Sequence, residues 1–491
     1  MQLQFQKKDV ACLRQLTGQV LNQEQTLTLT LDDSMPKIGR VVGAWGQVLL
    51  RGKEWRNGSV VVTGGVMVWA LYMPEEETEC YSAEGWLPFQ WKVDIPPTRY
   101  DGTVIANLLL RSVDARALTD KKLLLRANAG LQLQVLLPEQ AQLSQLEQVP
   151  EDLQLLKKTY PIQIPVEAGE KAFAFDEILQ YPNTCPQPEK LLFYRLLPQI
   201  AEQKMMADKV VFRGTAILHT VYFGQDGRLH TWDFELPFAQ FGDLEGRFSE
   251  DATAGIRMAV TALDVQKSEN GLQVNGAMTG QYVIYEKICA ELITDAYSTT
   301  ADIQLEKETV LLPMVSEISC QHLSCQSQLP ASAARVVDTQ FLPEHPCCAR
   351  DEQGPFVELC GCFRMLWENE QGLPELTIGD WNHRVQCQQE GKPEAYLTVS
   401  GNSQGSNEGS VQAELILDIV DFAGQTLETI CAVEIGEPND STDSPSLILR
   451  RVDGENLWEI AKATGSTVTA IKNANGLDDE PALNQMLIIP L

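Results

Sequence analysis

The feature that most restricts the fold of this chain is an internal repeat with a period of about 150 residues. Such a repeat predicts several copies of one structural unit. Four landmarks occur in register in both copies: 36–42 with 186–192, 60–64 with 210–214, Tyr72 with Tyr222, and 87–89 with 236–238 after one deletion. The tyrosine follows the glycine of its copy by eight residues in both cases. We interpret this as a duplicated unit.

Each copy has the residue pattern of β structure. The segments 66–72 and 216–222 are rich in β-branched and aromatic residues, and Gln225-Asp226-Gly227 is typical of a hairpin turn. We expect each copy to close with a hairpin, formed by 123–125 and 131–135 in the first and by 272–274 and 281–285, through a turn at 269–271, in the second. Strands at such short intervals predict tandem β-sandwich or barrel-like domains and a mainly β fold.

A third and less regular copy is expected at about 310–436. Its segments resemble those of the first two: 335–337 the entry strand, 359–365 the glycine strand, Gln371-Gly372 a turn and 411–417 the closing strand. The polar, glycine-rich segment 400–410 predicts a loop. The tyrosine and the Leu-Pro-Phe landmark are missing from this copy.

The segments between the copies complete the predicted organisation. Residues 138–158 are rich in Gln, Glu and Leu and are expected to hold a short connecting helix, and 437–446 predicts a flexible linker. The predicted divisions are three β domains (1–150, 151–300 and 301–436), the linker (437–446) and a small terminal module (447–491).

Charge and hydropathy exclude several classes of ligand. The formal net charge of -29 argues against nucleic acid and anionic lipid as direct ligands. No segment approaches the ~20 apolar residues of a membrane span, and the start of the sequence lacks the apolar core of a signal peptide. We therefore expect no nucleic acid, no membrane span and a cytosolic protein.

Twelve cysteines favour buried thiols, or redox-active thiols that crosslink in an assembly, over a disulfide framework. Eight of them lie between Cys320 and Cys431, near three histidines, but no spacing matches the paired C-x2-C of a zinc site. Cys360 and Cys362 are expected on one face of a strand. We therefore predict no metal site and no cofactor. The sequence also lacks a G-x-S-x-G, an H-E-x-x-H and a Walker motif, which favours a non-enzymatic protein over a wall hydrolase.

The last residues change in pattern and predict a β-α-α-β module. A short strand at 447–450 precedes a helix that begins at Leu457 and stops before Gly465, with Ser466 as the expected cap of a second helix. The segment 475–477 ends that helix, and 486–490 predicts the final strand.

This module resembles a LysM domain. The segment 452–461 (VDGENLWEIA) matches the family's V-x-x-G-D-T-L-W-x-I-A opening, and Thr467-Val468, Ile471, 475–477 and 484–490 match the rest. LysM domains bind N-acetylglucosamine polymers such as peptidoglycan in a shallow groove. The resemblance implies a groove at Gly454, Glu455, Asn456, Leu457, Asn475, Gly476 and Leu477. Glu455-Asn456 replaces the usual Asp-Thr and, more importantly, the sequence shows no export signal, whereas glycan-binding LysM modules usually belong to secreted proteins. A protein surface is therefore favoured over glycan as ligand, and Trp458 is expected to join the contacts.

The repeated β unit resembles the SPOCS domain of spore-coat proteins of Firmicutes, on the Pro-x4 start, the V-V-x-x-G strand ending in Tyr and the Leu-Pro-Phe strand. SPOCS units followed by LysM resemble coat morphogenetic proteins of the SipL type, with a role like that of SpoVID. The resemblance implies a scaffold that is made in the mother-cell cytoplasm and recruited to the forespore surface. It would bind a SpoIVA-like coat-basement ATPase and other coat proteins and promote coat encasement. The alternative is a LysM-mediated peptidoglycan-binding protein of the spore or cell wall.

Overall fold

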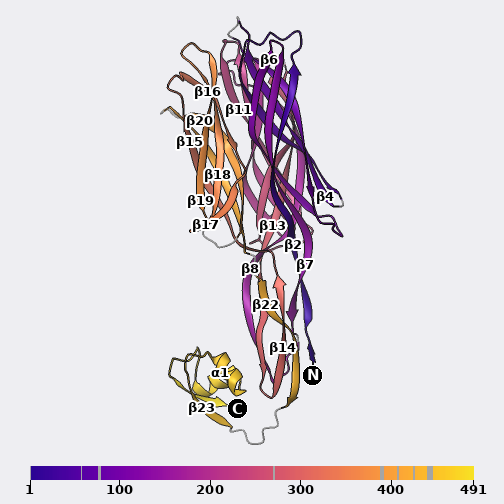
Figure 1. The fold of residues 1–491 in the computed structure, drawn as a ribbon, viewed down its shortest axis with the longest axis vertical. Helices are drawn as coiled ribbons and strands as arrows, with labels where there is room; N and C mark the ends of the chain where they lie inside the picture. Colours follow the sequence, from indigo (N-terminus) through magenta and orange to yellow (C-terminus); the bar gives the residue numbers. More distant parts are fainter. Residues whose placement is uncertain are drawn as a thin grey trace.

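The protein is an elongated, mainly β molecule, as the sequence predicted (Figure 1). The computed structural model describes residues 2–56, 58–75, 79–146, 148–268, 271–387, 392–405, 409–423, 426–438 and 446–491. Long strands form a head, some of them continue into a narrower stalk, and a small helical module lies beside the free end of the stalk (Figure 1).

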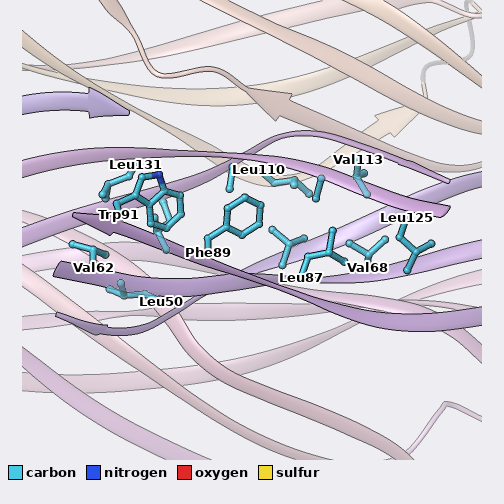
Figure 2. Packing of buried hydrophobic residues seen from close by; sticks show 14 of the residues in the cluster. Leu50, Val62, Val68, Leu87, Phe89, Trp91, Leu110, Val113, Leu125 and Leu131 are labelled. Carbon is cyan, nitrogen blue, oxygen red and sulfur yellow. The ribbon is translucent and has the colours of Figure 1, made fainter. Parts of the chain in front are cut away.

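The first unit of the head is a sandwich of two three-stranded antiparallel sheets, β3-β4-β5 and β2-β7-β6. Its strands are β2 (Gln6–Thr30), β3 (Arg40–Arg56), β4 (Ser59–Met73), β5 (Tyr81–Asp94), β6 (Thr103–Thr119) and β7 (Lys122–Gln145). Apolar side chains from both sheets, including Leu87, Phe89 and Leu125, meet between them (Figure 2). Alternation along each strand directs every second side chain into this core, which is the main source of stability.

The second unit repeats this order with the sheets β9-β10-β11 and β8-β13-β12. Its strands are β8 (Leu153–Leu179), β9 (Pro188–Met206), β10 (Lys209–Gly224), β11 (Leu229–Asp243), β12 (Thr253–Ser268) and β13 (Gly271–Ser298). The predicted turn at Gln225-Asp226-Gly227 joins β10 to β11 and gives Gly227 a φ of 77°.

A third unit has the same strand order, with one extra strand, β17. Its strands are β15 (Met314–Gln328), β16 (Arg335–Pro343), β17 (Cys347–Asp351), β18 (Gly354–Glu368), β19 (Pro374–Gln386), β20 (Lys392–Gly405) and β21 (Ser410–Ala423). Because β15 also pairs with β8, the second and third units share a six-stranded sheet. The division of the chain at 150, 300 and 436 stays an interpretation.

One β-bulge recurs at the same place in all three units. The entry strand skips one residue in its pairing with the following strand, namely Val42, Leu192 and Val337. Beside each bulge the partner strand places a large aromatic residue: Tyr72, Tyr222 and, in the third unit, Trp367. Trp367 therefore stands where the tyrosine landmark was missing.

The three units meet around the centre of the head. Trp45 of the first stacks on Phe193 of the second, with ring centroids 4.5 Å apart. Arg195 of the second forms a two-pronged ion pair with Asp338 of the third, at 2.8 and 2.9 Å. Arg364 of the third donates to the Ala44 carbonyl of the first at 2.6 Å. Each unit therefore contacts both others.

The stalk is built from strand ends and one further sheet. The sheet has the order β1-β22-β14, from β1 (Gln2–Gln4), β22 (Thr426–Pro438) and β14 (Ala301–Leu311). It packs on the extended ends of strands of the first two units, and the buried residues include Cys12, Leu143, Ile162 and Leu292.

Two predictions about the strands were wrong. The segment 138–158 is not a helix: β7 continues to Gln145 and β8 begins at Leu153. In the part of β7 that pairs with the start of β2, Ala141 and Leu143 are separated by one polar residue, as in a strand, and both are buried in the stalk. The expected closing hairpins are each one strand, because 123–135 lies within β7 and 272–285 within β13.

Other expectations fall partly outside the described residues. Residues 400–405 of the predicted 400–410 loop belong to β20. The pairing of β20 is interrupted by a bulge between Ser400 and Gln404, within the glycine-rich segment. Residues 406–408, the turn residues 269–270 and most of the predicted linker (439–445) lie outside the described residues.

Candidate binding site in the carboxy-terminal module

The terminal module has the predicted β-α-α-β order. It consists of β23 (Leu447–Arg451), α1 (Leu457–Thr464), α2 (Val468–Asn475) and β24 (Met486–Pro490). The core is made of Val452, Leu457, Ile460, Ala461, Ile471, Leu487 and Ile489. The expected cap was displaced by one residue: Thr467, not Ser466, caps α2, because Ser466 is buried and bonds to the Pro490 carbonyl.

The loop that enters α1 is fixed by its own polar groups. The Asn456 side chain accepts from the Glu459 amide at 2.9 Å, and Glu459 accepts from the Asn456 amide at 3.1 Å, which is a capping box. The Leu457 amide donates to Glu480 at 2.7 Å. Three side chains therefore satisfy amides at this positive end of the helix.

The Glu480 bond also joins the two loops that the LysM resemblance selected. Glu480 follows the 475–477 loop, and Leu457 ends the 454–457 loop. Leu457 and Leu477 also belong to the same core, so each of the two predicted segments has one residue in it. Sequence reasoning did not select Glu480, whose only signal is its place in the acidic run 478–480.

Several of the predicted residues have structural roles in the module. Leu457 is fully buried and Leu477 packs partly against the same core. Asn475 ties α2 to β24, because its amide accepts from the Ile488 amide at 2.7 Å and donates to the Ile488 carbonyl at 2.6 Å. Gly476 takes the left-handed conformation at the end of α2, with φ 64°.

The remaining predicted residues form the accessible part of the two loops. Gly454, Asn456 and Gly476 are exposed, and Glu455 is half-buried in an ion pair with Arg450 at 2.5 Å. Exposed carboxylates follow or flank them in the sequence at 453, 459 and 478–480, while Arg450 and Lys472 bring two cations to the same loops. Carboxylates therefore outnumber cations here, which suits a basic partner surface.

The module is also docked on the tip of the stalk. The Trp458 ring packs edge-on against Tyr297 of β13, with ring centroids 4.9 Å apart, and its Nε1 donates to Asp295 at 2.8 Å. The Tyr297 hydroxyl donates to the Ser466 carbonyl at 2.8 Å, and Lys462 pairs with Asp295 at 2.7 Å. Trp458, which the sequence assigned to partner contacts, is instead packed against the stalk of its own chain.

Burial and charge act in opposite directions at this contact. Burial pushes the pKa of Asp295 upward, but the hydrogen bonds from Lys462 and Trp458 outweigh it and leave the pKa below its usual range. Burial raises the pKa of Tyr297 to about 12, so its hydroxyl stays a donor at neutral pH. No sequence pattern predicted that Asp295 or Tyr297 would contact the module.

Among the described residues, the cysteines and histidines of the third unit do not assemble into a metal-binding group. All twelve cysteines are free, and burial raises the pKa of Cys325 to about 12, which makes its thiol a poor nucleophile. Cys360 and Cys362 lie on one face of β18, as expected. Within the described parts of the chain, no three His, Cys, Asp or Glu side chains are placed to hold a metal ion.

The strand order and the module define a protein of repeated β-sandwich units followed by a small β-α-α-β domain. A family model of the SipL SPOCS domain matches residues 187–268, which run through β9–β12 of the second unit. A family model of the LysM domain matches residues 452–490. The chain therefore carries a SPOCS domain and a LysM domain, as the resemblances predicted, and both domain families are non-catalytic.

No curated protein and no solved structure matches the chain. Among the described residues there is no helix long and apolar enough to span a membrane.

Proposed function

We propose that this protein is a non-enzymatic scaffold of the spore coat, which binds a SpoIVA-like coat-basement ATPase and promotes encasement of the forespore. The observation that carries the proposal is the combination of a SipL-type SPOCS domain and a LysM domain on one chain. The scaffold acts in the mother-cell cytoplasm, is recruited to the forespore surface and contacts other coat proteins there.

The geometry of the module supports a protein as its ligand. The accessible loop residues Gly454, Asn456 and Gly476 lie among exposed carboxylates, and the core and capping roles of Leu457 and Asn475 keep these loops in place. Charge complementarity of this kind selects a basic protein surface and raises the association rate. The contacts of the module with Tyr297 and Asp295 hold the loops at the tip of the stalk.

The alternative is a LysM-mediated peptidoglycan-binding protein. The LysM match favours it, because the resemblance implies N-acetylglucosamine polymers as ligands of this domain. The two functions differ in what the loops at 454–457 and 475–477 contact, so one experiment separates them.

The experiment offers the full chain both ligands. Immobilised protein is incubated with a purified SpoIVA-like ATPase and, separately, with purified peptidoglycan. The test variant is Asp478→Lys/Asp479→Lys, which reverses two exposed charges of the second loop. The matched control is Asp94→Lys/Asp101→Lys, which makes the same charge change at exposed positions of the first unit.

We expect wild type and the control variant to retain the ATPase. The affinity of the ATPase for the test variant should be at least tenfold lower than for wild type. Retention of peptidoglycan alone would support the alternative. Retention of neither ligand would contradict both functions of the module.

A further inference from the structure

The terminal module concentrates exposed apolar side chains on its two strands. Of the sixteen large apolar side chains that are exposed among the described residues, six belong to this module. Four of these six lie in β23 and β24 and are between 38% and 64% exposed: Leu447, Leu449, Met486 and Ile488. The other ten are distributed over seven strands and two loops of the head and stalk. The two strands of the module therefore carry the densest group of exposed apolar side chains in the described chain.

The strand register places these four side chains on one face of the sheet. Leu449 pairs directly with Ile488, and Leu447 and Met486 each lie two residues away from this pair on their own strand. Opposite residues of an antiparallel pair point to the same side, and the residues between them point to the other side. Leu487 accordingly points into the core under the helices and is fully buried. We call the side formed by the four exposed residues the outer face.

An apolar outer face is unusual for such a sheet. An antiparallel sheet that packs on one side normally presents polar residues to water on the other, and exposed apolar patches mark contact surfaces. The contacts with the stalk do not use the outer face, because they come from Trp458 and Lys462 of α1 and from Ser466. The segment that leads into β23, residues 437–446, contains no aliphatic or aromatic side chain larger than proline that could cover it.

We propose that the outer face binds the outer face of a second copy of this chain, so that two modules pair sheet against sheet. A flat aliphatic face is matched by another flat aliphatic face, as in the packing of two sheets. The scattered apolar residues of the described head and stalk offer no second face of this kind. A face that binds itself gives a closed two-fold dimer, whereas a contact between two different surfaces would continue into an open filament or a ring.

Charge at the two ends of the outer face selects the orientation of the pair. Arg451 lies at one end, opposite Met486. The other end begins at Leu447, directly after the segment 437–446, which carries three acidic residues and no basic one. A two-fold axis along the strands would bring the two copies of Arg451 together. An axis across the strands instead places the Arg451 end of one copy at the end where the acidic segment of the other copy enters, which is the favourable arrangement.

The size of the outer face predicts a weak pair. Each partner in a standard stable interface contributes roughly 20–30 residues, whereas the outer face presents four large side chains. The net charge of -29 on each copy adds repulsion. The dimer therefore forms where the chain is concentrated, as on a surface that holds many copies. The outer face shares no residue with the loops at 454–457 and 475–477, and this inference does not rest on the function proposed above.

The test is sedimentation equilibrium of the full chain from about 5 to about 500 µM, a range that covers weak association. Salt at about 0.3 M screens the repulsion between the acidic copies. The test variant is Leu449→Thr/Ile488→Thr, which makes the centre of the outer face more polar and keeps side chains that suit a strand. The matched control is Ile178→Thr/Leu311→Thr, at exposed positions outside the module. Hydrogen exchange of the module amides verifies that each variant is folded, and Leu447→Thr/Met486→Thr replaces a test variant that is not.

We expect wild type and the control to form dimers with the same dissociation constant, and the test variant to associate at least tenfold more weakly. A wild-type chain that stays monomeric over the whole range, a test variant that associates like wild type, or loss of association in the control would each overturn the proposal. Protection of β23 and β24 by the SpoIVA-like ATPase, in a chain that itself stays monomeric, would assign the outer face to that protein and would overturn the proposal as well.

Discussion

The centre of the head and the contact between stalk and module both join distant parts of the chain through an ion pair, but they differ in burial. The side chains of Arg195 and Asp338 in the head are 4% and 2% exposed, whereas those of Lys462 and Asp295 are 42% and 27% exposed. A buried pair cannot be opened without exposing or stranding a charge, while a partly exposed pair exchanges readily with water. The comparison predicts that the ion pair at the centre of the head resists opening more strongly than the ion pair between module and stalk.

The largest effect is expected from Asp338→Ala. This change leaves Arg195 buried without its carboxylate and also removes the contact of Asp338 with His219, so the head should lose about 3–5 kcal/mol of stability. Denaturant unfolding followed by circular dichroism measures the loss. Asp243→Ala, at a side chain that is 72% exposed, is the control and should change stability little. Similar curves for both variants would show that the buried pair does not hold the head together.

The next effect concerns the module. Tyr297→Ala removes the ring on which Trp458 packs and the bond to Ser466, and should lower the stability of the docked module by about 2–3 kcal/mol. Small-angle scattering should show a larger radius of gyration, because the module moves away from the stalk while the head stays intact. Tyr100→Ala, at an exposed tyrosine, is the control. An unchanged scattering curve would contradict a releasable module.

A third prediction concerns pH at the seam between the first and third units, where His345 lies against Gly130. Burial lowers the pKa of His345 to about 4. The folded protein therefore binds a proton at His345 less readily than the unfolded chain does. Above about pH 6.5 the ring is neutral in both states and stability is not affected, and stability falls as the pH drops from about 6.5 toward 4.

His345→Gln should remove the part of the pH dependence of stability that arises from this histidine. Between pH 7 and pH 5, wild type should lose about 1–2 kcal/mol more stability than the variant in urea unfolding. His383→Gln, at an exposed histidine of the same unit, should follow wild type. Equal slopes for wild type and His345→Gln would rule out this histidine as the origin.

The smallest effect is expected from Asn456→Ala, which removes the cap of α1 and should destabilise the module by about 1 kcal/mol without changing the head. Asn473→Ala, at an exposed position within α2, is the control and should be close to neutral. Hydrogen exchange of the α1 amides reports the change. A loss that spreads to the head strands would show that module and head unfold as one unit.

The elements that the sequence predicted correctly are those with a local pattern. The strands at 66–72 and 216–222 follow from β-branched and aromatic residues, and the βααβ module follows from the periodicity and caps of residues 447–491. The helix expected at 138–158 failed because its composition suited a helix, while the buried face of β7 required alternation. The amino-acid composition of that segment is compatible with both a helix and a strand, so it did not distinguish between them.

Contacts between distant parts of the chain could not be predicted. Arg195 and Asp338 are separated by 143 residues and are both charged, so neither resembles a core residue in the sequence. Trp458 matched a LysM position, but its contact with Tyr297 depends on how the stalk ends.

Hydrogen exchange of the full chain, with and without the SpoIVA-like ATPase, tests the central claim that the LysM loops recognise a protein while the head serves as their rigid support. The account predicts new protection at 453–457 and 475–480, with the strands at the centre of the head unchanged. Protection confined to the head, with these loops exchanging as in the free protein, would contradict it.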